Sequence, residues 1–213
     1  MPPADFEIAP LARLLSAYAG RDARRHRLLW ALDGRMAALV ATTSEPMIGQ
    51  IRLAWWGQAL EDESGVEGRG EPLIDAMRAA GIAPPPGLVP WLNGWKALLG
   101  DADLAAFAAG RGGGLFRALA GREDVPDWLT RAGAVWALWD LSGQGGDGDL
   151  AREAVDLARR HLPGAALPWP AAWKPLRIAF GLARADVAKG RRAPPALTPG
   201  LYLRLIALAL RGR

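Results

Sequence analysis

One helix-forming segment, SEPMIGQIRLAWWGQALED at residues 44–62, constrains the fold more than any other part of the chain. Ser44 is a residue type that caps helix N-termini, and Pro46 is tolerated in a first helical turn. The predicted helix has apolar side chains on two opposite faces, and both faces have to be covered by other helices. We therefore predict that residues 45–63 form a central helix sandwiched between other helices. With about 100° between successive residues, the apolar side chains form one face of Met47, Ile48, Ile51, Ala54 and Trp55, and a nearly opposite face of Leu53, Trp56 and Leu60.

The rest of the sequence has the same helical character. Leu and Ala dominate, β-branched residues are scarce, and alternating apolar and polar runs are nearly absent, which favours an all-α protein. Gly- and Pro-rich breaks separate the segments, without a fixed repeat period or a long linker. We predict a single domain over residues 1–213, built as an antiparallel helical bundle. The predicted helices are 8–19, 22–42, 45–63, 72–80, 86–99, 102–109, 113–120, 126–142, 148–161, 170–189 and 199–210.

Composition excludes several classes of site. The chain has no Cys, and its two histidines, His26 and His161, are too few for a zinc site. The N-terminus lacks the features of a signal peptide, and no apolar run reaches the roughly 18 residues of a membrane-spanning helix. The net charge of +4 comes from arginines spread along the chain, without a nucleic-acid-binding motif. We expect a cytoplasmic protein that does not bind nucleic acid.

Several segments resemble one family. SEPMIGQIRLAWWGQALED is similar to the signature helix of the squalene/phytoene synthase family, in particular its short bacterial branch, which is also similar to the mitochondrial complex I assembly factor on the same scaffold. RRHRLLWALDGRMAAL (24–39), PGLVPWLNGWKALL (86–99), AGAVWALWDLS (132–142) and WKPLRIAFGLARADVAKGRRAP (173–194) resemble further helices of that family. The resemblance implies the all-α isoprenoid synthase fold, whose helices surround a deep apolar cavity. In active members two prenyl diphosphates condense there head to head.

That reaction requires paired carboxylates. Departure of diphosphate leaves an allylic cation, and Mg²⁺ ions held by Asp residues at i and i+4 neutralise the leaving group. The resemblance places the two Asp-rich motifs at Asp33 and Asp140, but the residues four positions later are Ala37 and Gln144. Because both motifs are incomplete, we expect no metal site, no catalytic residue and no cofactor. Mg²⁺ would be required only if the chain were an active prenyl transferase using other carboxylates.

Some ligand-binding candidates remain. Arg52 lies at the seam between two apolar faces, where it forms either a structural salt bridge or part of an anion site beside a cavity. The resemblance implies that Arg24, Arg25 and Arg52 are the remnant of a diphosphate site near the cavity mouth. The tryptophans of the signature helix either line that cavity or fill the core. The candidates are therefore Arg24, Arg25, Asp33, Arg52, Trp55 and Trp56.

Three functions compete on this basis. The first, which we favour, is a squalene/phytoene synthase-like protein that lacks both magnesium motifs and either binds an isoprenoid or other lipid or serves as an assembly partner of another protein. The second is an active head-to-head prenyl transferase. The third is a helical protein with a collapsed cavity that acts only through protein contacts. The C-terminal LYLRLIALALRGR either packs on the bundle or contacts the inner face of a membrane, with KGRR (189–192) attracting anionic lipid.

Overall fold

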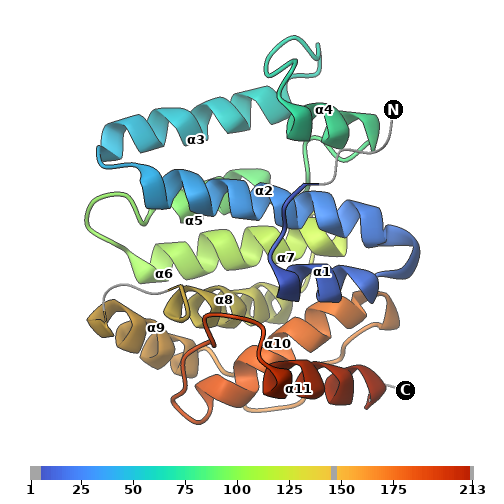
Figure 1. Cartoon of the computed structure of the whole chain (residues 1–213), viewed down its shortest axis with the longest axis vertical. Coiled ribbons are helices and arrows are strands. Elements are labelled where there is room, and N and C mark those ends of the chain that lie inside the picture. The colour runs from blue at the N-terminus through green and yellow to red at the C-terminus, as the bar shows by residue number, and fades with distance from the viewer. Residues whose placement is uncertain (1–5, 145–147, 212–213) are drawn as a thin grey trace.

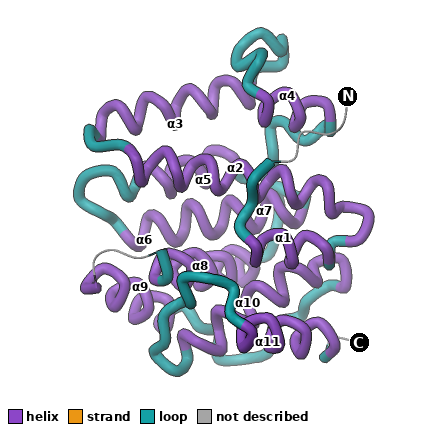
Figure 2. The backbone as a smooth tube through the Cα atoms, in the orientation of Figure 1, coloured by secondary structure: helices purple, strands orange, loops and turns teal. Residues whose placement is uncertain are grey.

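The computed structural model describes residues 6–144 and 148–211, and these residues form helices and loops with no strand among them (Figure 1, Figure 2). The all-α prediction is therefore confirmed. Two 3₁₀ turns, at Gly20–Asp22 and Ala171–Trp173, and one π-helix, at Ala108–Gly112, accompany the α-helices. The α-helices are α1 (Pro10–Ala17), α2 (Ala23–Thr42), α3 (Pro46–Glu61), α4 (Pro72–Ala79), α5 (Leu88–Lys96), α6 (Leu104–Phe107), α7 (Gly113–Ala120), α8 (Asp127–Ser142), α9 (Gly148–Arg160), α10 (Lys174–Val187) and α11 (Pro199–Leu210).

The helices are stacked in successive layers. In Figure 1, α3 lies at one end of the stack, α2 and α5 come next, α7 and α8 follow, and α10 and α11 lie at the opposite end. The central helix is α8, which packs against the π-helix, α7, α9 and α10. Its residues from Ala132 to Trp139 are all buried, because neighbouring helices cover every side of that stretch.

Glycines let the central helices approach one another backbone to backbone. A Cβ atom at Gly133 of α8 would overlap the carbonyl of Gly112 in the π-helix. A Cβ atom at Gly94 of α5 would likewise overlap the backbone of Arg111. Interiors this tightly packed leave no room for an added methyl group. The π-helix is thus held between α5 and α8, which fixes the position of Arg111.

The predicted central position of residues 45–63 is wrong, although the helix itself is present as α3. One face, with Leu53, Trp56 and Leu60, is buried on the side where α3 packs against α5 and α2. The other face is open, since the exposed fraction is 59% for Ile51 and 38% for Trp55, against 5% for Trp56. The apolar pattern therefore predicts a two-sided helix, but only one side is covered. Residue 45, not Ser44, is the N-cap, and no side chain caps it.

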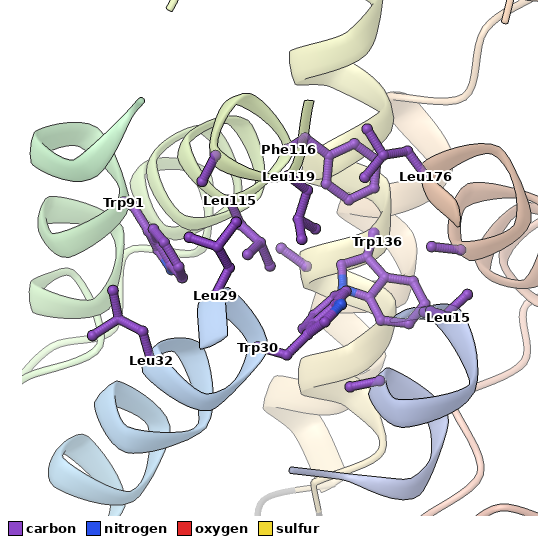
Figure 3. Close-up of a cluster of buried hydrophobic side chains, with 14 of the residues drawn as sticks. Leu15, Leu29, Trp30, Leu32, Trp91, Leu115, Phe116, Leu119, Trp136 and Leu176 are labelled. Atoms are coloured by element: carbon purple, nitrogen blue, oxygen red, sulfur yellow. The ribbon is translucent and has the colours of Figure 1, made fainter. Parts of the chain in front are cut away.

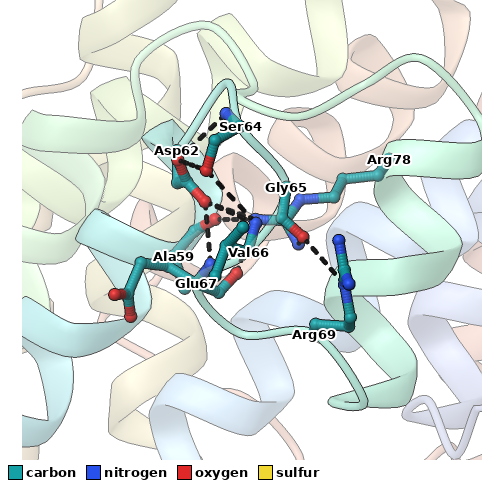
Figure 4. A network of polar contacts seen from close by, with 8 residues as sticks. All are labelled: Ala59, Asp62, Ser64, Gly65, Val66, Glu67, Arg69 and Arg78. Atoms are coloured by element: carbon teal, nitrogen blue, oxygen red, sulfur yellow. Dashed lines mark hydrogen bonds and ion pairs between the residues drawn. The ribbon is translucent and has the colours of Figure 1, made fainter.

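A tight loop fixes the C-terminal end of α3 against α4 (Figure 4). The carboxylate of Asp62 accepts hydrogen bonds from the hydroxyl and backbone of Ser64 and from the backbone N–H groups of Val66 and Glu67. These hydrogen bonds, with that from the Ser64 hydroxyl the strongest, lower the pKa of Asp62 to about 2. Arg78 of α4 donates to the carbonyls of Ala59 and Glu67, each at 2.6 Å. The loop thereby joins the two helices.

Large side chains fill the interior between α1, α2, α5, α7, α8 and α10 (Figure 3). Trp30 and Trp136 meet edge to face, with ring centroids 5.8 Å apart. Such pairs contribute roughly 0.5–1.5 kcal/mol beyond the area that they bury. The labelled members of this cluster are Leu15, Leu29, Trp30, Leu32, Trp91, Leu115, Phe116, Leu119, Trp136 and Leu176.

The C-terminal helix α11 packs on the bundle, which is one of the two interpretations of the segment LYLRLIALALRGR. Leu201, Leu205 and Ala209 of α11 are buried, on the side that contacts α10. Leu203 and Leu210 are exposed on the other side. Across the described residues, no helix combines the length and the apolar character needed to cross a membrane.

Candidate functional site

A single buried guanidinium joins the two carboxylates singled out in the sequence. Nη2 of Arg111 donates to Oδ2 of Asp33 at 2.6 Å and to Oδ2 of Asp140 at 2.7 Å. Nε of Arg111 donates to the other oxygen of Asp33 at 3.1 Å. Asp33 comes from α2 and Asp140 from α8, so one arginine from the π-helix connects two helices on either side of it.

Indole groups complete the hydrogen bonding of Asp33. The Nε1–H groups of Trp91 and Trp95 both donate to Oδ1 of Asp33, at 2.9 and 3.1 Å. The two tryptophans are four residues apart on α5 and therefore project from the same face of that helix. Asp33 is buried and accepts four hydrogen bonds, so the removal of its carboxylate from water is compensated.

Aromatic rings enclose the guanidinium itself. Its central carbon lies 4.6 Å from the ring centroid of Trp95 and 5.5 Å from that of Phe107. Burial disfavours the charged form of Arg111, but the attraction of Asp33 and Asp140 outweighs it, and the net effect raises the pKa of the arginine. Arg111 is therefore a permanent cation in the core.

The donor set does not fit a magnesium cluster. Mg²⁺ takes oxygen ligands in a close octahedral arrangement, usually with several waters. Here Arg111 already occupies the position between Asp33 and Asp140, and Gln144 donates to Asp140 at 3.0 Å, four residues along α8. Within the described residues, no group of three or more His, Cys, Asp or Glu side chains could hold a metal.

The structure does not bring the predicted arginines together. Arg25 donates to the carbonyls of Ala118 and Leu119, so it caps the C-terminal end of α7. Burial lowers its pKa, although Asp22 opposes that shift. Arg24 is exposed in the first turn of α2, and Arg52 is exposed on α3. Because α2 and α3 run antiparallel from their shared loop, these two arginines lie roughly 15–20 Å apart along the helix axes.

The remaining candidates lie in different environments. Trp56 is buried against its neighbours, whereas Trp55 is part of the open face of α3. Arg52 forms no salt bridge with another described residue, and it is exposed. Of the six candidates, Asp33 alone belongs to the buried charge cluster. The residue that completes the cluster, Arg111, lies in the tract GRGGG, which the sequence presents as a break between two helices.

A second buried carboxylate lies at the other end of the stack. Asp186 of α10 accepts from Nε1 of Trp139 at 3.2 Å and from Nη1 of Arg204 at 2.8 Å. Arg204 also donates to the carbonyl of Leu182 at 3.0 Å. This cluster ties α8, α10 and α11 together.

No protein-family model matches the chain, and neither a curated protein nor a solved structure matches it. Its function is therefore inferred from its own residues.

Proposed function

We propose that the chain is a non-catalytic protein with a single helical domain of the isoprenoid synthase type, and that it acts as an assembly partner of another protein. The single observation that carries this proposal is the salt bridge of Arg111 with both Asp33 and Asp140. If the resemblance holds, this salt bridge takes the place of the magnesium ions that active members of the family would bind between their Asp-rich motifs. The alternative, an active prenyl transferase, would need that position for a metal.

Charge supports the loss of catalysis. Ionisation of an allylic diphosphate requires concentrated positive charge at the leaving group, and such stabilisation supplies most of the acceleration in enzymes of this kind. One guanidinium between two carboxylates leaves the cluster with a net charge of −1 if both carboxylates are ionised. Because that sum is negative, the cluster repels a diphosphate rather than binding it.

The filled interior favours protein contacts over an enclosed lipid. Trp91, Trp95, Phe107 and Phe116 are fully buried and fill space among the helices. A ligand of drug size requires a pocket of about 300–1,000 Å³. Bulky side chains on α2, α5, α7 and α8 fill the interior between these helices (Figure 3).

The open face of α3 supplies a surface for such contacts. Met47, Ile48, Ile51 and Trp55 are exposed along one side of the helix. Contiguous exposed apolar side chains mark protein or membrane contacts. Three carboxylates, at Glu45, Glu61 and Glu63, outnumber the exposed Arg52 along the helix, and this balance disfavours an anionic lipid surface. A partner protein with an apolar surface fits this face better.

A turnover assay tests the loss of catalysis. The purified protein is incubated with labelled farnesyl or geranylgeranyl diphosphate and Mg²⁺, and we expect no squalene, phytoene or cyclopropyl intermediate above a control without protein. Product above that control would overturn the proposal. Native mass spectrometry of the same sample is expected to show no bound isoprenoid; a stoichiometric isoprenoid would support the lipid-binding alternative instead.

A site-specific cross-link tests the assembly role. A photoreactive amino acid replaces Ile51 on the open face of α3, and a control chain carries it at Val66, which is also exposed but lies in the loop after α3. We expect one protein, identified by mass spectrometry, to be linked from position 51 and not from position 66. Equal labelling from both positions would contradict a specific contact at α3.

A further inference from the structure

A surface pocket lies between the start of α8, the end of α9 and the loop that joins α9 to α10. Its volume is about 470 Å³, and its lining includes Trp128, Arg131, Arg160, His161 and Leu167. That volume falls within the range of about 300–1,000 Å³ found for small-molecule sites. The pocket is distinct from the Arg111 cluster, because Arg131 precedes Asp140 on α8 by roughly 13 Å of helix.

Basic groups from two helices converge on this pocket. Its lining contains two arginines and one histidine and no carboxylate. Within the described residues, neither Arg131 nor Arg160 has an ion-pair partner, whereas the adjacent Arg159 pairs with Asp156 at 3.3 Å. Burial, then Arg160 and then Arg131, lowers the pKa of His161, and all three groups line the same pocket. The pocket therefore has an excess of positive charge and hydrogen-bond donors.

An aromatic wall stands beside the basic groups. The ring of Trp128 lies 4.9 Å from that of Trp169 and 5.9 Å from that of Trp173, measured between centroids. These contacts hold the indole of Trp128 in place at the start of α8. Leu162 and Leu167 add apolar surface from the loop. The lining thus combines hydrogen-bond donors that suit an anion with surface that suits an apolar or aromatic group.

We propose that this pocket binds a phosphate monoester of an apolar or aromatic group, with the phosphate between Arg131, Arg160 and His161 and the organic group against Trp128 and Leu167. Guanidinium groups donate paired hydrogen bonds to phosphate oxygens, which makes arginine the preferred residue for this anion. The site does not depend on the proposed assembly role, since it uses none of the residues of the Arg111 cluster or of the open face of α3.

Protonation of His161 gives the binding a pH signature. The charged groups that act on this imidazole are Arg160 and Arg131, and both oppose its protonation in the unliganded protein. A phosphate placed among them reverses that effect, so the complex favours the imidazolium. Affinity should therefore be higher at pH 6 than at pH 8. Because a phosphate monoester itself gains a proton near pH 6, the comparison is made against His161→Gln, in which only the ligand titrates.

The test is calorimetric titration with phenyl phosphate. We expect binding that is stronger than that of inorganic phosphate, that weakens about tenfold or more in Arg131→Gln and in Arg160→Gln, and that is unchanged in the control Arg159→Gln. The substituted arginines are exposed, so the melting temperature of each variant should match that of the parent. We also expect the ratio of affinities at pH 6 and pH 8 to fall in His161→Gln.

The source of the phosphate is distinguished by a second arm with vesicles that contain phosphatidic acid. Sedimentation with these vesicles that depends on Arg131 and Arg160 would assign the pocket to a lipid headgroup, and phenyl phosphate binding alone would assign it to a soluble ester. Both outcomes support the site. No heat with millimolar phenyl phosphate, equal binding of inorganic phosphate, or undiminished binding by the double variant Arg131→Gln/Arg160→Gln would overturn it.

Discussion

The buried carboxylates Asp33 and Asp186 have the same kinds of partner but different access to water. Each accepts hydrogen bonds from indole N–H groups and from an arginine. Arg111, the partner of Asp33, has a side chain only 3% exposed, whereas that of Arg204, the partner of Asp186, is 37% exposed. The pair of Asp33 with Arg111 is therefore buried in the core, whereas the pair of Asp186 with Arg204 reaches the surface.

That difference determines what happens when either partner is lost. A buried ion left without its counter-ion retains its full desolvation penalty, whereas a half-exposed one regains water. Arg111 also connects elements that are distant in sequence, since it lies in the π-helix and holds α2 and α8. The same chemical groups are therefore essential to the core around Asp33, whereas around Asp186 they make a contact near the surface that matters less for stability.

The largest expected effect is that of Arg111→Ala. It leaves Asp33 and Asp140 facing each other without a cation, and we expect the free energy of unfolding to fall by about 3–5 kcal/mol. Urea denaturation followed by circular dichroism measures this change. The exposed Arg69→Ala is the control, with an expected effect of less than about 0.5 kcal/mol. A loss below about 1 kcal/mol for Arg111→Ala would show that the two carboxylate sites do not differ in this way.

A third buried group, His26, differs from the ion-paired carboxylates Asp33 and Asp186, because burial favours its neutral form. Burial, followed by repulsion from Arg25, lowers its pKa from 6.5 to about 4. Between these values the unfolded chain binds a proton that the folded chain does not, so stability falls as the pH decreases from about 6.5 to about 4. The full difference amounts to roughly 3 kcal/mol.

Urea denaturation at several pH values between 7.5 and 4.5 measures this dependence. Carboxylates and His161 also titrate in acid, so the contribution of His26 is the difference between the parent and His26→Leu. We expect the pH slope to be smaller in the variant. Equal slopes would mean that His26 is protonated as readily in the folded chain as in the unfolded one.

The smallest expected effect is that of Asp186→Asn. Arg204 can turn toward water when the charge of its partner is removed, and the amide oxygen can still accept from Trp139, so we expect a loss of about 1 kcal/mol. Asp33→Asn provides the matched comparison, since it weakens the fully buried Arg111. Denaturation of both variants should give a clearly larger loss for Asp33→Asn. Equal losses would contradict the role assigned to solvent access.

The sequence predicts local helix boundaries well and tertiary position poorly. The sequence predicts a helix over residues 22–42, and α2 spans Ala23–Thr42, because caps and breaks are local signals. The position of α3 depends on which of its two apolar faces another helix covers. No pattern within residues 45–63 contains that information, so the expected central helix lies at one end of the stack.

The site shows the same limit. The sequence indicates Asp33 and Asp140 as candidate site residues, but not their common partner Arg111. GRGGG has the composition of a loop, whereas in the structure its glycines lie in the π-helix and α7, and Gly110, Gly112 and Gly114 pack against the backbones of α5, α8 and the residues just before α5. Whether a glycine breaks a helix or permits a close contact depends on what lies opposite, and Gly94 and Gly133 are distant in sequence.

The π-helix also sets how far α7, the helix that follows it, is rotated about the helix axis relative to α6. One extra residue in a helical turn rotates everything downstream by about 100° about the helix axis. With that rotation, Phe107 before the turn and Leu115 and Leu119 after it all point into the interior. Loss of a single residue within Ala108–Gly112 would turn the apolar side of α7 outward. The loop after α3 could absorb the loss of a residue. The π-helix could not, because it fixes the rotation of α7 relative to α6 about the helix axis.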